Sequence, residues 1–194
     1  MNFLAHIYLS GDDPNIMVGN FIGDFVKGRN LTEQFGTAVA KGIELHRAID
    51  EFTDSHPVVR LSKLRLRAGY GHYAPVIVDV FYDHFLAKNW NDYNDLLLPD
   101  FAEKTYQTIE NFNTILPEDV KRMLPYMIRG NWLVNYSRIE GIQRALTGMS
   151  RRTKFNSKMD ESVNDLRAHY DDFKKEFETF FPELTTFSKT FINS

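Results

Sequence analysis

Histidine and aspartate side chains recur at a spacing of four residues in the first half of the chain. His46, Asp50 and Asp54 follow one another in this way. In an α-helix, four residues overshoot a full turn by about 40°, so all three side chains fall within about 80° on one face. The same spacing places Asp79 and Asp83 together on a second helix. Each helix therefore presents stacked groups that can bind protons or metal ions.

These groups could form a metal site, because two such helices can face one another in a bundle core and enclose a cation. Mixed imidazole and carboxylate ligands suit Mn²⁺, Fe²⁺ or Mg²⁺, and the chain has no cysteine that would favour zinc. A metal ion also lets several carboxylates lie close together, because their mutual repulsion otherwise raises their pKa values. The sequence predicts a metal site with these candidate ligands: Asp24, His46, Asp50, Asp79 and Asp83.

The surroundings of these acids bear on their role. The helix that carries Asp79 and Asp83 is otherwise strongly apolar, so it is expected to be buried. A buried carboxylate needs a metal, an arginine or several hydrogen-bond donors. Asp24 follows Gly19 and Gly23, and glycines permit close approach of the backbone. This pattern indicates either that Asp24 is delivered into a crowded site or that two helices pack closely.

A purely structural interpretation of the same residues is also open. His46 and Asp50 could form a simple contact between residues four apart on a solvated helix face. Arg47 could neutralise Asp50 or Asp54 as a salt bridge. The neighbouring His84 points about 100° away from Asp83, so it could be an acid–base group rather than a ligand.

The elements that must position these groups are predicted to be helices. The chain has 194 residues, of which 43% are hydrophobic and 25% charged, which is typical of a single globular domain. Runs of β-branched residues with alternating polarity are nearly absent. We expect an all-α, single-domain helical bundle of about seven helices spanning 1–194, with helices at 36–54, 72–90, 100–114, 117–129, 131–147 and 156–180. One aromatic stripe is expected in its core: Phe173, Phe177, Phe180 and Phe181.

Charge and hydropathy exclude several classes of partner. The net charge of −3 gives no bulk attraction to nucleic acid or to an anionic membrane. No apolar run reaches the roughly 18 residues that a transmembrane helix needs. The first ten residues contain no basic region and carry a histidine, which is untypical of a signal peptide. The expected location is the cytoplasm.

Several blocks of the sequence resemble one known family, the acyl carrier protein phosphodiesterases. The resemblance runs from residue 1 to about residue 155. It is carried by these blocks, in the expected order: Met1–His6, Gly19–Phe25, His46–Asp50, Phe52–Pro57, Asp79–Phe85 and Met149–Arg152.

That family is similar to the helical HD-type metal phosphohydrolases. The resemblance therefore implies an HD-domain-like fold and Mn²⁺-dependent hydrolysis of the 4′-phosphopantetheine arm of holo-acyl carrier protein. The products would be apo-acyl carrier protein and 4′-phosphopantetheine. One departure leaves the ligand set open: HD proteins carry an adjacent His-Asp pair, whereas the order here is Asp83-His84.

The implied reaction needs a metal-activated water and a proton donor. A metal lowers the pKa of a bound water and polarises a phosphoryl oxygen. The serine alkoxide of the carrier protein is a poor leaving group, so a side chain is expected to protonate it. His56 and His84 are the candidates for this donor, and Asp54 joins them in the expected catalytic set.

The implied partner is an acidic helical protein, so a basic surface should lie near the metal. Arg60, Lys63 and Arg67 share one helix face, in a stretch from 58 to 73 that contains no acid. The expected substrate-binding set is His6, Arg60, Lys63, Arg67, Arg151 and Arg152. Solvated basic faces with no partner are the alternative.

Two rival functions remain at this level. An HD-like phosphohydrolase could act on nucleotides or other small phosphoesters with the same metal site. A non-catalytic helical module could bind an acidic protein through the basic face alone. The sequence leaves open the number of metal ions, the choice between Mn²⁺ and Mg²⁺, and the oligomeric state.

Overall fold

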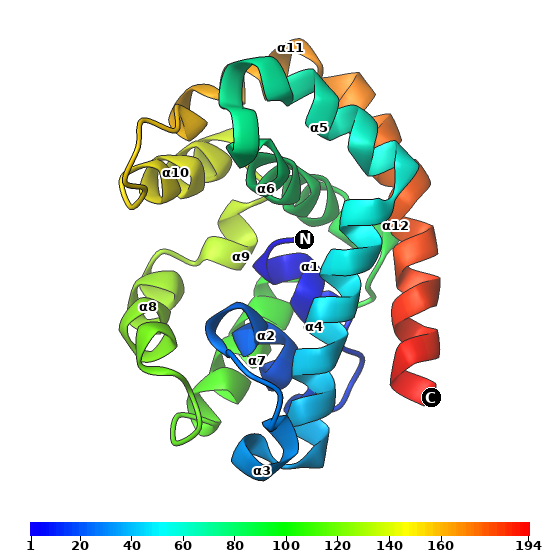
Figure 1. The fold of residues 1–194 in the computed structure, drawn as a ribbon, viewed down its shortest axis with the longest axis vertical. Helices are drawn as coiled ribbons and strands as arrows, with labels where there is room; N and C mark the ends of the chain where they lie inside the picture. Colours follow the sequence, from blue (N-terminus) through cyan, green and yellow to red (C-terminus); the bar gives the residue numbers. More distant parts are fainter.

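The computed structural model describes residues 1–194 and consists of helices joined by turns, with no strand (Figure 1). The expected all-α class is confirmed. The α-helices are α1 (Phe3–Tyr8), α2 (Pro14–Ile22), α3 (Leu31–Phe35), α4 (Thr37–Ser55), α5 (Pro57–Tyr70), α6 (Ala74–Lys88), α7 (Leu98–Asn111), α8 (Glu118–Arg129), α9 (Trp132–Asn135), α10 (Ile139–Ser150), α11 (Val163–Ala168) and α12 (Tyr170–Asn193). Single turns of 3-10 helix complete the fold: η1 (Gly23–Phe25), η2 (Gly71–Tyr73), η3 (Trp90–Asp92) and η4 (Met159–Glu161).

Most of the expected helices are present with small shifts at their ends. The predicted ranges 36–54, 72–90, 100–114 and 117–129 correspond to α4, α6, α7 and α8, with no end displaced by more than three residues. The range 131–147 is divided between α9 and α10. Short helices such as α1, α9 and α11 explain why the structure has twelve α-helices rather than about seven.

The single helix predicted over 156–180 is wrong. The backbone leaves helical geometry at His169 (φ −123°, ψ 32°), between α11 and α12. Leu166 and Phe173 lie on either side of this break, and both are fully buried. Because their spacing of seven residues fits an unbroken helix, the apolar pattern does not reveal the interruption. Helix α12 also continues through Pro182 to Asn193.

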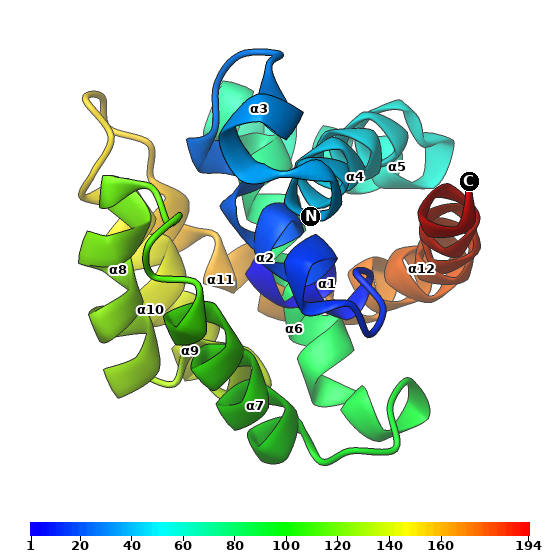
Figure 2. The ribbon, with the colours of Figure 1, turned by 90° about the horizontal axis from the view of Figure 1, so that it is seen from below.

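Helix α6 lies at the centre of the hydrophobic core, and residues such as Val78, Phe81 and Phe85 are inaccessible to solvent. The expected aromatic stripe of α12 is buried as well. Helices α4 and α12 run along one side of the molecule and α7 to α9 along the other, with the N-terminus between them (Figures 1 and 2). No helix is both long and apolar enough to cross a membrane.

Helices α2 and α4 pack with their backbones in direct contact at two glycines. A Cβ atom on Gly19 would lie 2.1 Å from the carbonyl oxygen of Val39, and one on Gly42 would lie 2.2 Å from that of Ile16. Neither position can hold a larger residue unless the helices move apart. This contact fixes the distance between the chain around Asn20 and the face of α4 that carries His46.

Replacing Gly19 with alanine is therefore expected to destabilise the fold by about 3 kcal/mol, the upper end of the usual cost of overpacking, because backbone atoms cannot rotate away. Gly148 is the matched control, since nothing lies within 4 Å of a Cβ added there. Gly148→Ala should stabilise α10 by up to about 1 kcal/mol, the difference in helix propensity. Thermal or urea unfolding of both variants measures these shifts, and equal shifts would contradict the close contact of α2 and α4.

Candidate metal centre and basic hollow

Three side chains from α1 and α4 converge on one point. His6, His46 and Asp50 each offer a ligand atom, and these atoms all lie within 4.8 Å of one another. The two oxygens of Asp50 lie 3.2 Å from Nε2 of His6 and 3.3 Å from Nε2 of His46. The imidazole rings stack with their centroids 4.0 Å apart. This group of three is called the His6–His46–Asp50 group below.

Asn20 on α2 orients both imidazoles. Its backbone carbonyl lies 2.8 Å from Nδ1 of His46, and a carbonyl only accepts, so Nδ1 donates. Its side-chain amide donates to the carbonyl of His6 and to Ser10, which directs its oxygen at Nδ1 of His6, 2.8 Å away. When a ring is neutral, the proton on Nδ1 leaves a lone pair on Nε2, which points toward Asp50. Nε2 of His6 also lies 3.2 Å from the carbonyl of Met1. Such outer hydrogen bonds are typical of metal-binding histidines.

Asp24 in η1 extends the group toward solvent. Its Oδ1 lies 3.1 Å from Nε2 of His46, and its side chain is 68% exposed. Gly23 makes this approach feasible, because a Cβ there would lie 2.3 Å from the ring of His46. Both alternatives considered for the glycines are thus present: Gly19 permits helix packing, and Gly23 makes room for an imidazole beside Asp24.

The pKa values of the group indicate that it holds one positive charge, on His46, and disfavours a second on His6. Burial lowers the pKa of His46, but hydrogen bonds to Asp24 and Asp50 outweigh it and raise the pKa to about 9. Burial and the neighbouring His46 lower the pKa of His6 to about 4. Burial opposes ionisation of Asp50, but hydrogen bonds from both histidines hold its pKa far below its usual range. One cation placed between these side chains would satisfy the same charges.

The N-terminal ammonium of Met1 lies between an aspartate of α4 and an aspartate of α6. The Met1 ammonium is 3.3 Å from Oδ1 of Asp50 and 3.3 Å from Oδ1 of Asp79. Although burial opposes ionisation of this ammonium, the charges of Asp79 and Asp50 raise its pKa to about 10. Asp79 is thus near the His6–His46–Asp50 group and is separated from it by a cation.

Asp83, a predicted ligand, faces another way. Its two oxygens accept hydrogen bonds from the backbone N–H groups of Leu4 and Ala5, at 2.8 and 3.1 Å. Burial raises its pKa to about 7 even though these bonds favour the ionised form. Both oxygens are therefore committed to the first turn of α1. Asp83 holds in place the helix that carries His6.

The three residues expected to be catalytic lie outside the group. His56 caps α5, accepting from the backbone N–H of Val58, with its Nε2 3.3 Å from Glu183. His84 is buried, donates to the carbonyl of Tyr136 and accepts from the hydroxyl of Tyr170. Asp54 is exposed and pairs with Lys63 at 2.6 Å.

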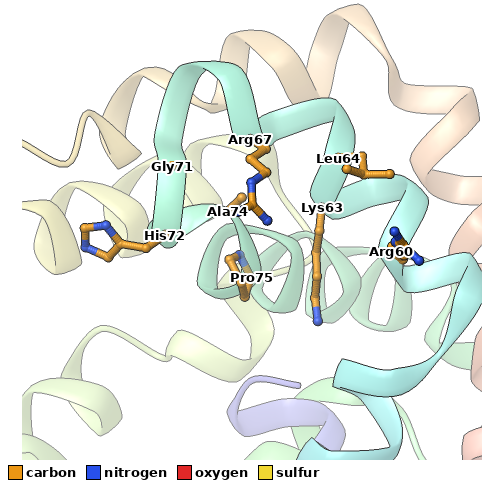
Figure 3. A pocket seen from close by; sticks show the side chains of 8 residues that line it. All are labelled: Arg60, Lys63, Leu64, Arg67, Gly71, His72, Ala74 and Pro75. Carbon is orange, nitrogen blue, oxygen red and sulfur yellow. The ribbon is translucent and has the colours of Figure 1, made fainter.

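Lys63 is one of the residues that line a basic hollow in the surface. The hollow has a volume of about 530 Å³ and lies between α5, η2 and the start of α6 (Figure 3). Its lining includes three of the predicted cations, Arg60, Lys63 and Arg67. The exposed Arg151 and Arg152 follow α10 and do not line it.

His6 is the residue whose place the sequence does not reveal. It was expected to bind substrate, yet its Nε2 lies in the His6–His46–Asp50 group. Its neighbours in the chain are apolar, and no spacing connects it to α4. Contacts between distant parts of the chain bring it there, among them the hydrogen bond to Asn20 and the bonds from the start of α1 to Asp83.

Comparison with known proteins gives one consistent family. The sequence model of the family described as acyl carrier protein phosphodiesterase matches residues 1–184. A protein of that name from Photorhabdus laumondii subsp. laumondii is 35% identical over 185 residues, covering 95% of this chain and 93% of the relative. Another, from Escherichia coli O6:H1, is 38% identical over 189 residues, covering 95% of both. No solved structure matches the chain.

Proposed function

Since the chain belongs to the acyl carrier protein phosphodiesterase family, we propose that it hydrolyses the phosphodiester linking 4′-phosphopantetheine to a serine of holo-acyl carrier protein. An oxygen of water bonds to phosphorus and the bond from phosphorus to the serine oxygen breaks. One proton of the water ends on that serine oxygen, which yields apo-acyl carrier protein and 4′-phosphopantetheine. The observation that supports the proposal is the His6–His46–Asp50 group, one helical turn from Asp54, which pairs with Lys63 of the basic hollow.

The His6–His46–Asp50 group is the proposed metal site. Its donors are two imidazole nitrogens with lone pairs toward Asp50, together with carboxylate oxygens, a set that suits Mn²⁺ and also Fe²⁺ or Mg²⁺. Asp24 is the proposed additional ligand. Asp79 was also expected to be a ligand, but the Met1 ammonium lies between it and Asp50, so we leave it out of the proposed set. When bound, the metal activates water and polarises the phosphoryl group.

The protein's own residues prepare this site. Asn20 fixes the ring orientation of His6 and His46, and Asp83 fixes the position of α1. His56 and His84 were the expected proton donors. His56 caps α5 and lies against Glu183, and His84 is held between Tyr136 and Tyr170. We therefore assign them to the fold rather than to the reaction.

The test is the mass of the carrier protein after incubation with the purified protein and Mn²⁺. We expect a shift from the holo to the apo mass that disappears in EDTA and returns when Mn²⁺ is restored. A nucleotide panel assayed in parallel should stay intact. Hydrolysis of nucleotides with an unchanged carrier mass would contradict the proposed substrate.

The basic hollow is the proposed docking face for the acidic carrier. Leu64 on this face is 52% exposed and lies between Arg60 and Arg67 on α5. This arrangement fits an acidic helix that also offers an apolar side chain. Charges at such a rim chiefly accelerate association and make it sensitive to salt.

Charge reversal at Arg60 and Arg67 together should raise KM for holo-acyl carrier protein by about 10-fold at low salt, because steering by charge contributes at least that factor. The salt dependence of kcat/KM should flatten at the same time. Lys104→Glu on the exposed side of α7 is the control and should change neither quantity. An unchanged salt dependence in the double variant would exclude this face as the docking site.

A further inference from the structure

Among the cations that line the basic hollow, Lys63 is the one whose ammonium group pairs with a carboxylate of α4. Figure 3 shows its side chain extended away from Arg67, toward the ribbons of α1 and α4. The side chain is only 17% exposed, and its Nζ donates to Oδ1 of Asp54 at 2.6 Å. Lys63 thus begins in the hollow and ends beside the helix that carries His46 and Asp50.

The charge of Lys63 also reaches Asp79. Burial raises the pKa of Asp79, and the positive charges of the Met1 ammonium and of Lys63 act against this rise. The geometric link to the candidate metal centre is Asp54, which lies one helical turn beyond Asp50 on the same face of α4 and pairs with Lys63.

The ion pair of Lys63 is one that a substrate can replace. Asp54 is 71% exposed, and an ion pair with so exposed a partner contributes little to stability. Arg65 on the same helix shows the opposite case. Its guanidinium makes two hydrogen bonds, of 2.7 and 2.8 Å, to Glu176, whose side chain is 11% exposed. Arg65 is therefore fixed, whereas Lys63 can exchange its partner.

We propose that Lys63 exchanges Asp54 for a phosphoryl oxygen of the scissile diester and stabilises the charge that develops there during hydrolysis. This role rests on the proposed function and separates Lys63 from Arg60 and Arg67, which serve docking. A diester carries one negative charge, and charge on its oxygens must be stabilised as water attacks. A lysine ammonium supplies a charge-assisted hydrogen bond to such an oxygen. Lys63 transfers no proton in this scheme.

The test compares Lys63→Met with wild type on two substrates, holo-acyl carrier protein and bis(p-nitrophenyl) phosphate. Removing one such donor is expected to lower kcat by about 100-fold on both, with KM for the carrier changed by less than about threefold. Mn²⁺ affinity measured by calorimetry should be unchanged or tighter, because a positive charge has left the edge of the centre. Lys63→Arg should recover part of the lost kcat.

The matched control is Lys121→Met, which removes a lysine that is likewise paired with a helix carboxylate, Glu118 on α8. It should behave as wild type in both assays. If Lys63→Met raises only KM for the carrier and cleaves the small diester at the wild-type rate, Lys63 is a docking residue and the proposal is overturned. A wild-type protein that leaves holo-acyl carrier protein intact would instead refute the proposed function and this role with it. Should Lys63→Met fail to fold, Lys63→Gln takes its place.

Discussion

Asp50→Asn is expected to lose turnover of holo-acyl carrier protein and to bind Mn²⁺ at least about 100-fold more weakly, since loss of even an outer partner costs metal sites 10–100-fold. The carboxylate of Asp50 faces His6, His46 and the Met1 ammonium at once. Asparagine keeps the shape but removes the charge that joins them. Calorimetry with Mn²⁺ and the carrier mass assay measure the two losses.

Glu51→Gln is the matched control for this variant, because Glu51 is the next residue on α4 and is exposed. It should bind Mn²⁺ and turn over the carrier as wild type does. An Asp50→Asn protein that keeps both properties would remove Asp50 from the metal centre. Wild-type-like unfolding of the variant would show that the loss is local.

Asp83→Ala is expected to have the largest effect on stability, about 3 kcal/mol or more, because an unpaired buried donor costs about 1–3 kcal/mol and two are created. These donors are the N–H groups of Leu4 and Ala5, and both residues are fully buried. Release of α1 also withdraws His6, so Mn²⁺ affinity should fall in the folded fraction. Urea unfolding and calorimetry measure both effects.

The control is Asp13→Ala, which removes an exposed N-cap from α2 that accepts from Asn15. Its cost should be about 1 kcal/mol. Equal destabilisation by the two substitutions would contradict the role of Asp83 in holding α1. Mn²⁺ binding by folded Asp83→Ala at wild-type strength would show that α1 keeps its place without this carboxyl.

The effect of Asp83 should also depend on pH. Burial raises its pKa in the folded chain to about 7, above the value of about 3.9 in an unfolded chain. The folded state therefore holds the proton more tightly, and this contribution to stability is lost as pH rises from about 4 to about 7. The difference in unfolding free energy between wild type and Asp83→Ala should shrink between pH 5 and pH 8.

The helix spacing of the sequence predicts the part of the site that lies on one helix. His46 and Asp50 share a face of α4 and meet the same centre. Asp54 lies on that face as well, but it is one turn farther along and reaches Lys63 instead. Spacing defines a shared face, and the depth of each residue along the helix depends on what packs against it.

The site residues on other helices are positioned by tertiary packing, which the spacing of residues along one helix does not predict. His6 reaches the centre because Asn20 and Asp83 fix α1. Asp83 is a plausible metal ligand in the sequence because a buried carboxylate needs either a metal ion or hydrogen-bond donors. Those donors prove to be two backbone N–H groups of a helix 78 or 79 residues away in the chain.

We propose that the His6–His46–Asp50 group binds the catalytic metal ion. The most direct test is an anomalous scattering map from crystals of the protein loaded with Mn²⁺. We expect the strongest peak between Nε2 of His6, Nε2 of His46 and the carboxylate of Asp50. A strongest peak beside Asp54, His56 or Asp83, with none at this group, would show that the metal binds elsewhere.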